Sequence, residues 1–569
     1  MIYFKYILKL NLSKLTELFG TKKTAFVLLL NSGSLAGENM TKEQIAAEIS
    51  GGKAMLGIEF GSTRIKAVLI NTAYEPVASG AFDWENSLVD GIWTYSLEEI
   101  HNGISSAFVD MKNDAYSKYG VKPVKLAAMG VSAMMHGYLA FDAKNNLLVP
   151  FRTWRNTITG EASKALTELF NYPIPERWSI AHLYQAILNK EEHVKNLAFF
   201  TTLAGYAHWK LTGQKVIGVG DASGMFPIDE KTGDFNKNMI SKFNSLVEGK
   251  YSWKLEDLLP KVLSAGVEAG SLTEEGATWL DPEGTLQPGA VFAAPEGDAG
   301  TGMTATNSVA ERTGNVSAGT SIFSMVVLEK PLAKTYLGLI DVVTTPDGKP
   351  VAMVHGNNCT GEYDKWIKLI GEAATLLGAD YTKGQLYDLL LKSALKGDKD
   401  CGGCVAYNYI SGETITGFNE GRPLFVRTQN ANFNLANFMR SQIFTALAAL
   451  RAGMDILFDE KVPLDRLTGH GGYFKTEGVG LPFMAAAMHT PVSAMSTAGE
   501  GGPWGMALLA AYVLNGKGST LSDWLNKEVF ASAKVETVNP DSSDVEGFNK
   551  FFENYKKGLA VERAAVENL

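Results

Sequence analysis

Two segments of the same design, far apart in the chain, constrain the fold more than any other feature of this 569-residue sequence. Residues 57–70 read GIEFGSTRIKAVLI, and residues 314–329 read GNVSAGTSIFSMVVLE. Each predicts a strand, a tight turn of glycine and hydroxyl residues, and a second apolar strand. Two interpretations stay open here: a chance pair of glycine hairpins, or a phosphate-binding turn in each of two related halves.

The remaining pattern mixes strands and helices. Strand signals fill 55–83, and a helix is predicted after Ser96, which has the side chain of a helix cap and is followed by acidic residues. Residues 125–142 predict a strand that runs into a histidine-bearing turn, and residues 432–459 predict a long core helix. A chain of this length exceeds one ordinary core. We therefore expect an α/β protein of at least two domains.

Composition excludes several classes of partner. The net charge is −9 and no basic run interrupts it, which argues against nucleic acid binding. No stretch approaches the ~18 apolar residues of a membrane span, and three cysteines cannot form a disulfide framework, so a cytoplasmic location is expected. Cys401 and Cys404 form a lone CGGC, which we interpret as two incidental thiols. Residues 1–39 faintly imitate a secretory leader, and we expect them to be either an extension outside the core or the product of a misassigned start.

Eight segments in order resemble the FGGY family of carbohydrate kinases, and within it the xylulokinase-type pentulose kinases. The phosphate turns are GIEFGSTRIKAVLI and VSAGTSIF. The sugar and catalytic segments are GVSAMMHGYLAFD, PFRTWRN, GVGDASGMFPID and APEGDAGTGM. The adenosine segments are LTGHGGYFKT and GEGGPWGMALLAA. The match covers roughly residues 55–515, and its specificity lies in the order and spacing of the segments.

The resemblance implies an α/β fold of two actin-like ATPase (ribonuclease H-like) domains with the active site in the cleft between them. It implies an N-terminal domain over 40–305, a C-terminal domain over 306–535 and a helical tail over 536–569. The implied activity is transfer of the γ-phosphate of ATP, with Mg²⁺, to a hydroxyl of a ketopentose in carbohydrate catabolism. Oligomeric state is not fixed by the sequence, and a homodimer is one alternative.

The resemblance also implies the sugar-side residues. Asp298 matches the family's catalytic position and is expected to accept the proton of the sugar hydroxyl. Met135 and His136 match sugar contacts, and Trp154 lies in a loop where a tryptophan stacks on the sugar. Asp221 matches an acid that is either structural or supports the site.

The nucleotide side would depend on glycine and hydroxyl turns. Glu59 stands where the family normally has Asp, and its expected role is to bind Mg²⁺, directly or through water. The expected ATP contacts are donors in two facing turns and backbone positions at the adenosine segments: Gly61, Ser62, Thr63, Arg64, Gly319, Thr320, Ser321, Gly471, Gly472 and Gly501.

Two departures leave the sugar open. Ala299 replaces the family's Asn after the catalytic Asp, and Met134 replaces the Gln before Met-His. Because each change removes a polar contact to a substrate hydroxyl, the preferred sugar can differ from xylulose. L-ribulose, another ketopentose, or a related polyol or ketose is then expected.

Two other classes stay open. One is an actin- or Hsp70-like ATPase without a sugar acceptor. The other is a catalytically degenerate family member that binds sugar as a sensor.

Overall fold

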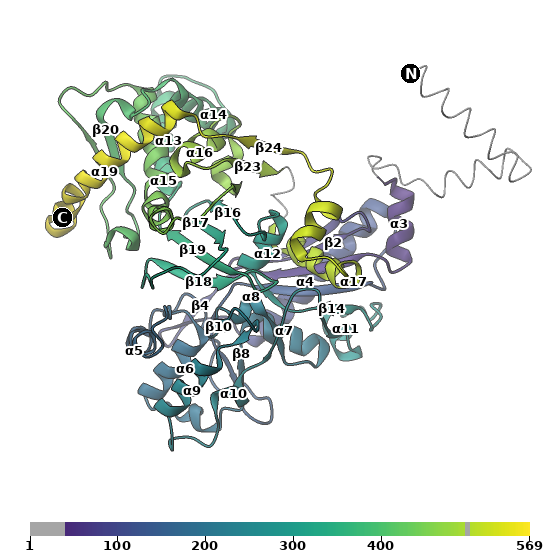
Figure 1. Cartoon of the computed structure of the whole chain (residues 1–569). Helices are drawn as coiled ribbons and strands as arrows, with labels where there is room; N and C mark the ends of the chain where they lie inside the picture. Colours follow the sequence, from purple (N-terminus) through teal and green to yellow (C-terminus); the bar gives the residue numbers. More distant parts are fainter. Residues whose placement is uncertain (1–39, 496–500) are drawn as a thin grey trace, which may run out of the picture. The chain divides into compact units, whose positions relative to one another are not determined.

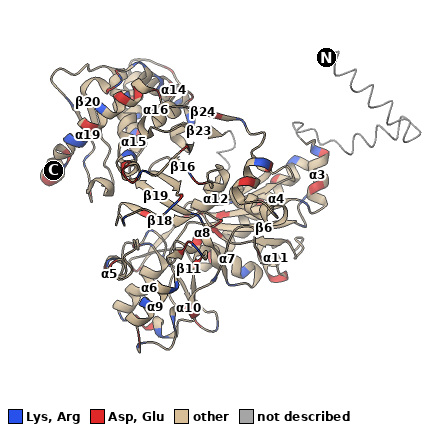
Figure 2. Cartoon of the chain, viewed as in Figure 1, with Lys and Arg blue, Asp and Glu red and all other residues tan. Residues whose placement is uncertain are grey.

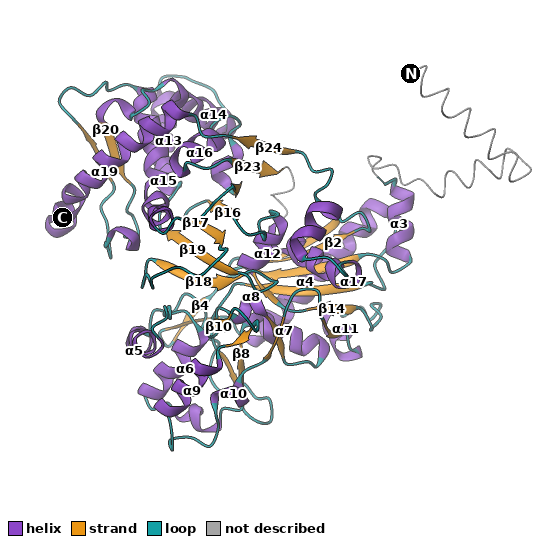
Figure 3. Ribbon diagram, in the orientation of Figure 1, coloured by secondary structure: helices purple, strands orange, loops and turns teal. Residues whose placement is uncertain are grey.

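Two seven-stranded sheets that share the order of six strands organise the chain in the computed structural model (Figure 1). The structure describes residues 40–495 and 501–569, so the expected extension over 1–39 lies outside the described residues. The predicted α/β class is confirmed: Figure 3 shows helices around both sets of strands.

The first sheet has the order β13-β14-β6-β1-β2-β3, with β15 also paired to β6. Strands β1, β2 and β3 are antiparallel neighbours, whereas β6 is parallel to β1 and β14 is parallel to β6. Its strands are β1 (Met55–Phe60), β2 (Arg64–Ile70), β3 (Pro76–Asp83), β6 (Ala128–Ala133), β13 (Glu268–Ser271), β14 (Val291–Ala293) and β15 (Glu296–Gly297).

The second sheet has the order β18-β19-β17-β16-β22-β23-β24. From β19 to β24 this repeats the first sheet read from β3 to β13, and β18 is an additional edge strand. Here β16, β17 and β19 are antiparallel neighbours, β22 is parallel to β16, and β23 is parallel to β22. Its strands are β16 (Thr313–Ala318), β17 (Ile322–Val327), β18 (Ile340–Thr344), β19 (Pro350–Gly356), β22 (Arg466–His470), β23 (Val492–Met495) and β24 (Val535–Val538). The two predicted hairpins, β1–β2 and β16–β17, therefore hold equivalent positions in a duplicated sheet.

The larger helices are α3 (Lys42–Ser50), α4 (Leu97–Tyr119), α5 (Gly160–Phe170), α6 (Ser179–Leu188), α7 (Leu203–Thr212), α9 (Lys237–Leu246), α12 (Asp298–Ala305), α13 (Gly361–Leu376), α14 (Lys383–Ser393), α15 (Leu435–Asp459), α16 (Gly480–Met488), α17 (Gly501–Asn515) and α19 (Ser542–Asn568). The prediction for α4 is confirmed in detail. Ser96 accepts the N–H of Glu99 in a capping box, and Gly120 ends the helix in the left-handed conformation.

Helix α17 crosses the boundaries expected from the sequence. It follows the last parallel strand of the second sheet, but it packs on β1 and β6 of the first sheet. Glycines permit this approach: a Cβ on Gly57 would lie 2.0 Å from the carbonyl oxygen of Pro503, and a Cβ on Gly130 would lie 2.3 Å from Met506 Cε. The expected division of the chain at 305/306 therefore does not separate the elements that cover the first sheet.

The C-terminal segment belongs to the second core. Residues 535–538 form the edge strand β24 beside β23, whereas a helical tail was expected from residue 536. Helix α19 buries Phe548, Phe551 and Tyr555 against α15 and α16. On its outer side acidic and basic positions alternate (Figure 2), with ion pairs such as Lys550–Glu546.

Helix α15 is the predicted core helix. By length and composition this helix could cross a membrane, although no such stretch was expected from the sequence. However, 78% of its most apolar 18-residue window is buried inside the fold. It packs against β19, β20 (Cys404–Tyr407) and α16, as a core helix does.

Candidate active site

The turn between β1 and β2 has its carbonyl groups held from outside. Trp84 Nε1 donates to the oxygen of Gly61 at 2.7 Å, the Tyr95 hydroxyl donates to the oxygen of Ser62 at 2.6 Å, and the Trp84 N–H donates to the oxygen of Thr63 at 3.2 Å. The rings of Trp84 and Tyr95 stack with their centroids 4.0 Å apart. The backbone of this turn is therefore fixed by an aromatic pair beneath it.

The turn between β16 and β17 is held in the same way by backbone. The N–H of Thr360 donates to the oxygen of Gly319 at 3.0 Å, and the N–H of Cys359 donates to the oxygen of Thr320 at 2.8 Å. The N–H of Gly319 donates to the oxygen of Ser321 at 2.9 Å.

The opposite side of both turns consists of unused donors. Within residues 40–495, the N–H groups of Ser62, Thr63, Thr320 and Ser321 donate to no protein acceptor. Successive free N–H groups in a tight turn form a concave site for an anion. The two turns are therefore built for the same ligand chemistry.

Asp298 is the first residue of α12 and follows β15, which pairs with β6. Burial raises its pKa to about 6, against the opposing effect of the backbone N–H groups of Ala299, Met135 and Asp298 itself. A carboxyl group with such a pKa is ionised at neutral pH and can still take up a proton, as a general base must.

Glu59 lies at the end of β1, close enough to Asp298 for the two charges to interact. Burial, and then repulsion from Asp298, raise the pKa of Glu59 to about 7, whereas Lys66 on the neighbouring strand lowers it. The Glu59 carboxylate also abuts the start of α17, since a Cβ on Gly502 would lie 2.4 Å from its Oε1. The first turn, the segment that leads into Asp298 and α17 thus meet at this carboxylate.

These two carboxylates are hard oxygen donors, which suit Mg²⁺. No group of three or more His, Cys, Asp or Glu side chains suited to a metal occurs among the described residues. The donor set therefore fits an ion that keeps water and phosphate oxygens as its other ligands.

His136 lies in the turn after β6 with a φ of +73°, which is rare outside glycine. Its Nδ1 lies 3.2 Å from the oxygen of Gly224, so Nδ1 carries the proton and Nε2 is an acceptor. Burial, with help from Arg177, lowers its pKa well below the usual value, so the ring is neutral. The side chain of Met135 packs against Gly297 and also approaches Gly224.

Two expected contacts lie at the rim of the first turn. Trp154 is 40% exposed, which excludes core packing, and its Nε1 donates to Ser62 Oγ at 3.3 Å. Arg64 is committed elsewhere: its guanidinium forms a two-point ion pair with Asp83, in which Nη2 and Oδ2 are 3.0 Å apart.

The glycines of the adenosine segments differ in their surroundings. Gly471 has a φ of +102°, and a Cβ there would lie 2.4 Å from the oxygen of Ala318, beside the second turn. Gly472 has open space where a Cβ would be, and Gly501 has a φ of +67° at the start of α17. Residues 496–500, which include part of the expected segment, lie outside the described residues.

Two buried acids, Asp221 and Glu296, lie beside the segment that leads into Asp298. Asp221 in α8 (Val219–Ala222) accepts a hydrogen bond from Thr202 Oγ1 at 2.6 Å, and burial raises its pKa to about 7. Glu296 is 1% exposed, and sequence reasoning missed it. The signal available was an acid in an otherwise apolar and glycine-rich segment, AAPEGDAG, next to a buried strand.

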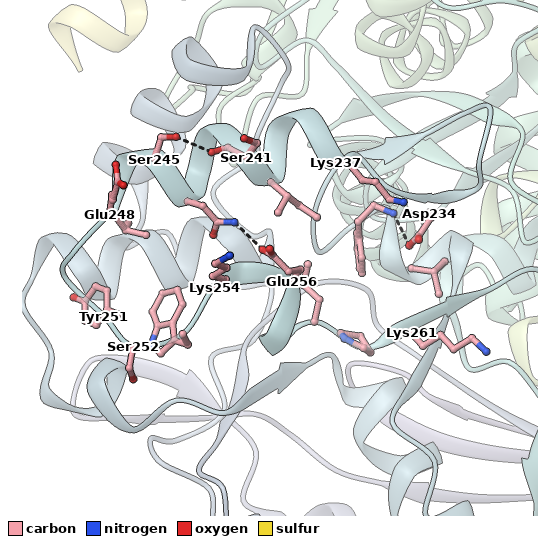
Figure 4. Close-up of a pocket in the computed structure, with 18 of the residues that line it drawn as sticks. Asp234, Lys237, Ser241, Ser245, Glu248, Tyr251, Ser252, Lys254, Glu256 and Lys261 are labelled. Carbon is pink, nitrogen blue, oxygen red and sulfur yellow. Dashed lines mark hydrogen bonds between the residues drawn. The ribbon is translucent and has the colours of Figure 1, made fainter.

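A cavity of about 1000 Å³ opens elsewhere, lined by α9 and the segment from Val247 to Val262 (Figure 4). Tyr251 and Trp253 stack there with their centroids 4.9 Å apart. No residue expected at the active site lines this cavity, so the carboxylate cluster and the two turns remain the candidate site.

Comparison with known proteins agrees with this arrangement. Residues 54–285 match the family model of the N-terminal domain of the FGGY family of carbohydrate kinases, and residues 314–514 match that of the C-terminal domain. The xylulose kinase of Haemophilus influenzae is 20% identical over 528 residues, which are 89% of this chain and 99% of that protein.

Two solved structures from Lactobacillus acidophilus, a ligand-bound xylulose kinase and a gluconate kinase, both have a TM-score of 0.72 and 17% identity. Each covers 90% of this chain and 98% of its own. These likenesses confirm the predicted fold of two actin-like α/β domains, and they do not distinguish between sugars.

Proposed function

The chain belongs to the FGGY family of carbohydrate kinases, and from this premise we propose that it transfers the γ-phosphate of ATP to a hydroxyl of a ketopentose, xylulose- or L-ribulose-like. The observation that carries the proposal is the position of Asp298. Its carboxylate feels the backbone N–H of Met135 in the sugar segment and the charge of Glu59 at the first turn. This supports a role for Asp298 as a base between the expected sugar and the expected phosphates.

In this proposal Asp298 accepts the proton of the sugar hydroxyl. The sugar oxygen then forms a bond to the γ-phosphorus, while the bond between that phosphorus and the β,γ-bridging oxygen breaks and ADP leaves. The free N–H groups of Ser62, Thr63, Thr320 and Ser321 bind the β- and γ-phosphates. Glu59 would hold Mg²⁺, which spreads the phosphate charge when bound. The neutral His136 would accept a sugar hydroxyl at Nε2, and Trp154 would cover the sugar from the rim.

The remaining expected ATP contacts would have secondary roles in this proposal. Gly471, Gly472 and Gly501 would let backbone approach the nucleoside, and Arg64 would reach phosphate only after leaving Asp83. A cytoplasmic role in pentose catabolism is part of the same proposal.

The test is a substrate screen. We would incubate the protein with ATP, Mg²⁺ and D- or L-xylulose, D- or L-ribulose, glycerol or gluconate, and measure ADP together with phosphosugar by mass spectrometry. The expected result is one phosphosugar per ADP with a pentulose. ATP hydrolysis without phosphosugar would indicate the actin- or Hsp70-like alternative, and nucleotide binding without turnover would indicate a degenerate sugar-binding member.

A further inference from the structure

Glu296 lies two residues before Asp298, at the end of the first sheet, and its side chain turns inward. Its Oε2 accepts the N–H of Asp221 at 3.1 Å and its Oε1 accepts the N–H of Gly220 at 3.4 Å. Gly220 and Asp221 belong to α8, so this one carboxyl group joins α8 to the segment that leads into Asp298.

Glycines make room for the Glu296 carboxyl group. A Cβ on Gly218 would lie 2.2 Å from its Oε1, and a Cβ on Gly220 would lie 2.3 Å from its Oε2. A Cβ on Gly300, in α12, would lie 3.4 Å from Oε2. The carboxyl group therefore fills a space bounded by α8 and by the first turn of α12, and no side chain could replace Gly218 or Gly220 without moving it.

Helix α8 is itself fixed to the second sheet. Thr344, at the end of β18, donates from Oγ1 to the oxygen of Val219 at 3.0 Å, and its N–H donates to Ser223 Oγ at 3.1 Å. A displacement of the catalytic loop relative to α8 is thus also a displacement relative to the half that carries the second turn.

The charge around Glu296 is compatible with a neutral acid. Burial and then the neighbouring Asp221 raise its pKa well above the usual value, while the N–H groups of Gly220, Asp221 and Gly297 oppose this. A protonated Glu296 satisfies the N–H groups of α8 without adding a negative charge to the cluster that contains Asp298.

We propose that Glu296 is a positioning residue for Asp298: its buried carboxyl group locks the start of α12 onto α8 and thereby fixes the catalytic carboxylate between the sugar and the phosphates. The inference rests on the proposed role of Asp298 as the base. Displacing such a group by about 1 Å can lower turnover about 100-fold.

The kinetic test compares three variants. Glu296→Ala removes both acceptor oxygens and should lower kcat about 100-fold while KM for ATP changes less than about threefold. Glu296→Gln keeps one acceptor oxygen and the neutral shape, and should retain kcat within about fivefold. Glu562→Ala is the matched control, because Glu562 is also fully buried and accepts one backbone N–H, that of Arg422, at 2.6 Å. Its kcat should stay within about twofold.

The second readout needs no sugar. In hydrogen–deuterium exchange, Glu296→Ala should speed uptake in residues 218–224 and 297–305, whereas Glu296→Gln and Glu562→Ala should leave both segments unchanged. If the alanine variant does not fold, Glu296→Asp, whose carboxyl is about 1.5 Å shorter, should show the same faster exchange.

Wild-type-like kcat or exchange in Glu296→Ala would overturn the inference, and so would equal losses in the Gln and Ala variants. A wild type without sugar-dependent turnover would instead reject the proposed function, and exchange would still decide whether Glu296 fixes the loop.

Discussion

At the scale of single residues, Asp298 is held between opposing influences. Burial favours its neutral form, and the N–H groups of Ala299 and Met135 favour its charge. Asp298→Asn keeps the size and polarity of the side chain but cannot accept the sugar proton. We expect it to lower kcat by about 10²–10⁴ and to leave ATP affinity, measured by calorimetry, unchanged. A variant with near-normal turnover would reject the assignment of the base.

The same carboxylate predicts how turnover depends on pH. Because the pKa of Asp298 is about 6, the base is progressively protonated below that pH. Turnover should then fall about tenfold for each pH unit below about 6. Measuring kcat/KM for the sugar from pH 5 to pH 8 checks this, and a flat profile across that range would contradict it.

The free energy of unfolding should depend on pH in the opposite direction to turnover, and decrease as the pH rises. Burial raises the pKa of Asp298 to about 6 and those of Glu59 and Asp221 to about 7, so the folded state binds these protons more tightly than the unfolded chain. The stability from these groups is complete below the unfolded pKa of about 4 and is lost as pH rises through 6 to 7.

Asp298→Asn should therefore melt at a higher temperature than the wild type at pH 8, with little difference at pH 4.5. Thermal unfolding at both values measures this. Equal shifts at the two pH values would show that the buried charge of Asp298 is not the cause.

At the scale of elements, the two hairpins owe their anion-binding form to groups outside them. Tyr95 is fully buried, and its hydroxyl fixes the Ser62 carbonyl so that the turn presents its N–H groups on the other side. Tyr95→Phe should raise KM for ATP about fivefold, as loss of about 1 kcal/mol predicts, and should change kcat by less than about twofold.

The control for Tyr95→Phe is Tyr206→Phe, which removes another buried hydroxyl, one that pairs with His101 Nε2 at 2.9 Å. It should leave KM for ATP unchanged. Equal effects of the two variants on KM would mean that Tyr95 acts through general stability.

At the scale of the whole molecule, a helix from the C-terminal half of the sequence covers the first sheet. Residues 502–513 of α17 are buried, largely on the first sheet, although they come from the C-terminal half of the sequence. A fragment of residues 40–306 would expose the apolar surface that α17 covers.

That fragment should aggregate when expressed alone and become soluble when residues 307–569 are co-expressed. Size-exclusion chromatography and thermal unfolding of both preparations check this. Cooperative unfolding of the isolated 40–306 fragment would show that α17 is dispensable for the first sheet.

The sequence alone determined the duplicated hairpins, the capped helix α4 and the core helix α15, whereas Asp298 was identified through the resemblance to the FGGY family. The three structural elements follow from local chemistry: apolar periodicity, a serine cap, and glycine with hydroxyl residues at a turn. Such signals act within a few residues and are readable in order along the chain.

Only the tertiary structure decided which distant groups meet. Arg64 pairs with Asp83, α17 returns to the first sheet, and Glu296 enters a space left by glycines of two other segments. Each depends on contacts between residues remote in sequence, and burial there changes what a side chain does. An isolated glutamate reads as a surface acid, whereas the fold makes Glu296 an interior acid beside the catalytic loop.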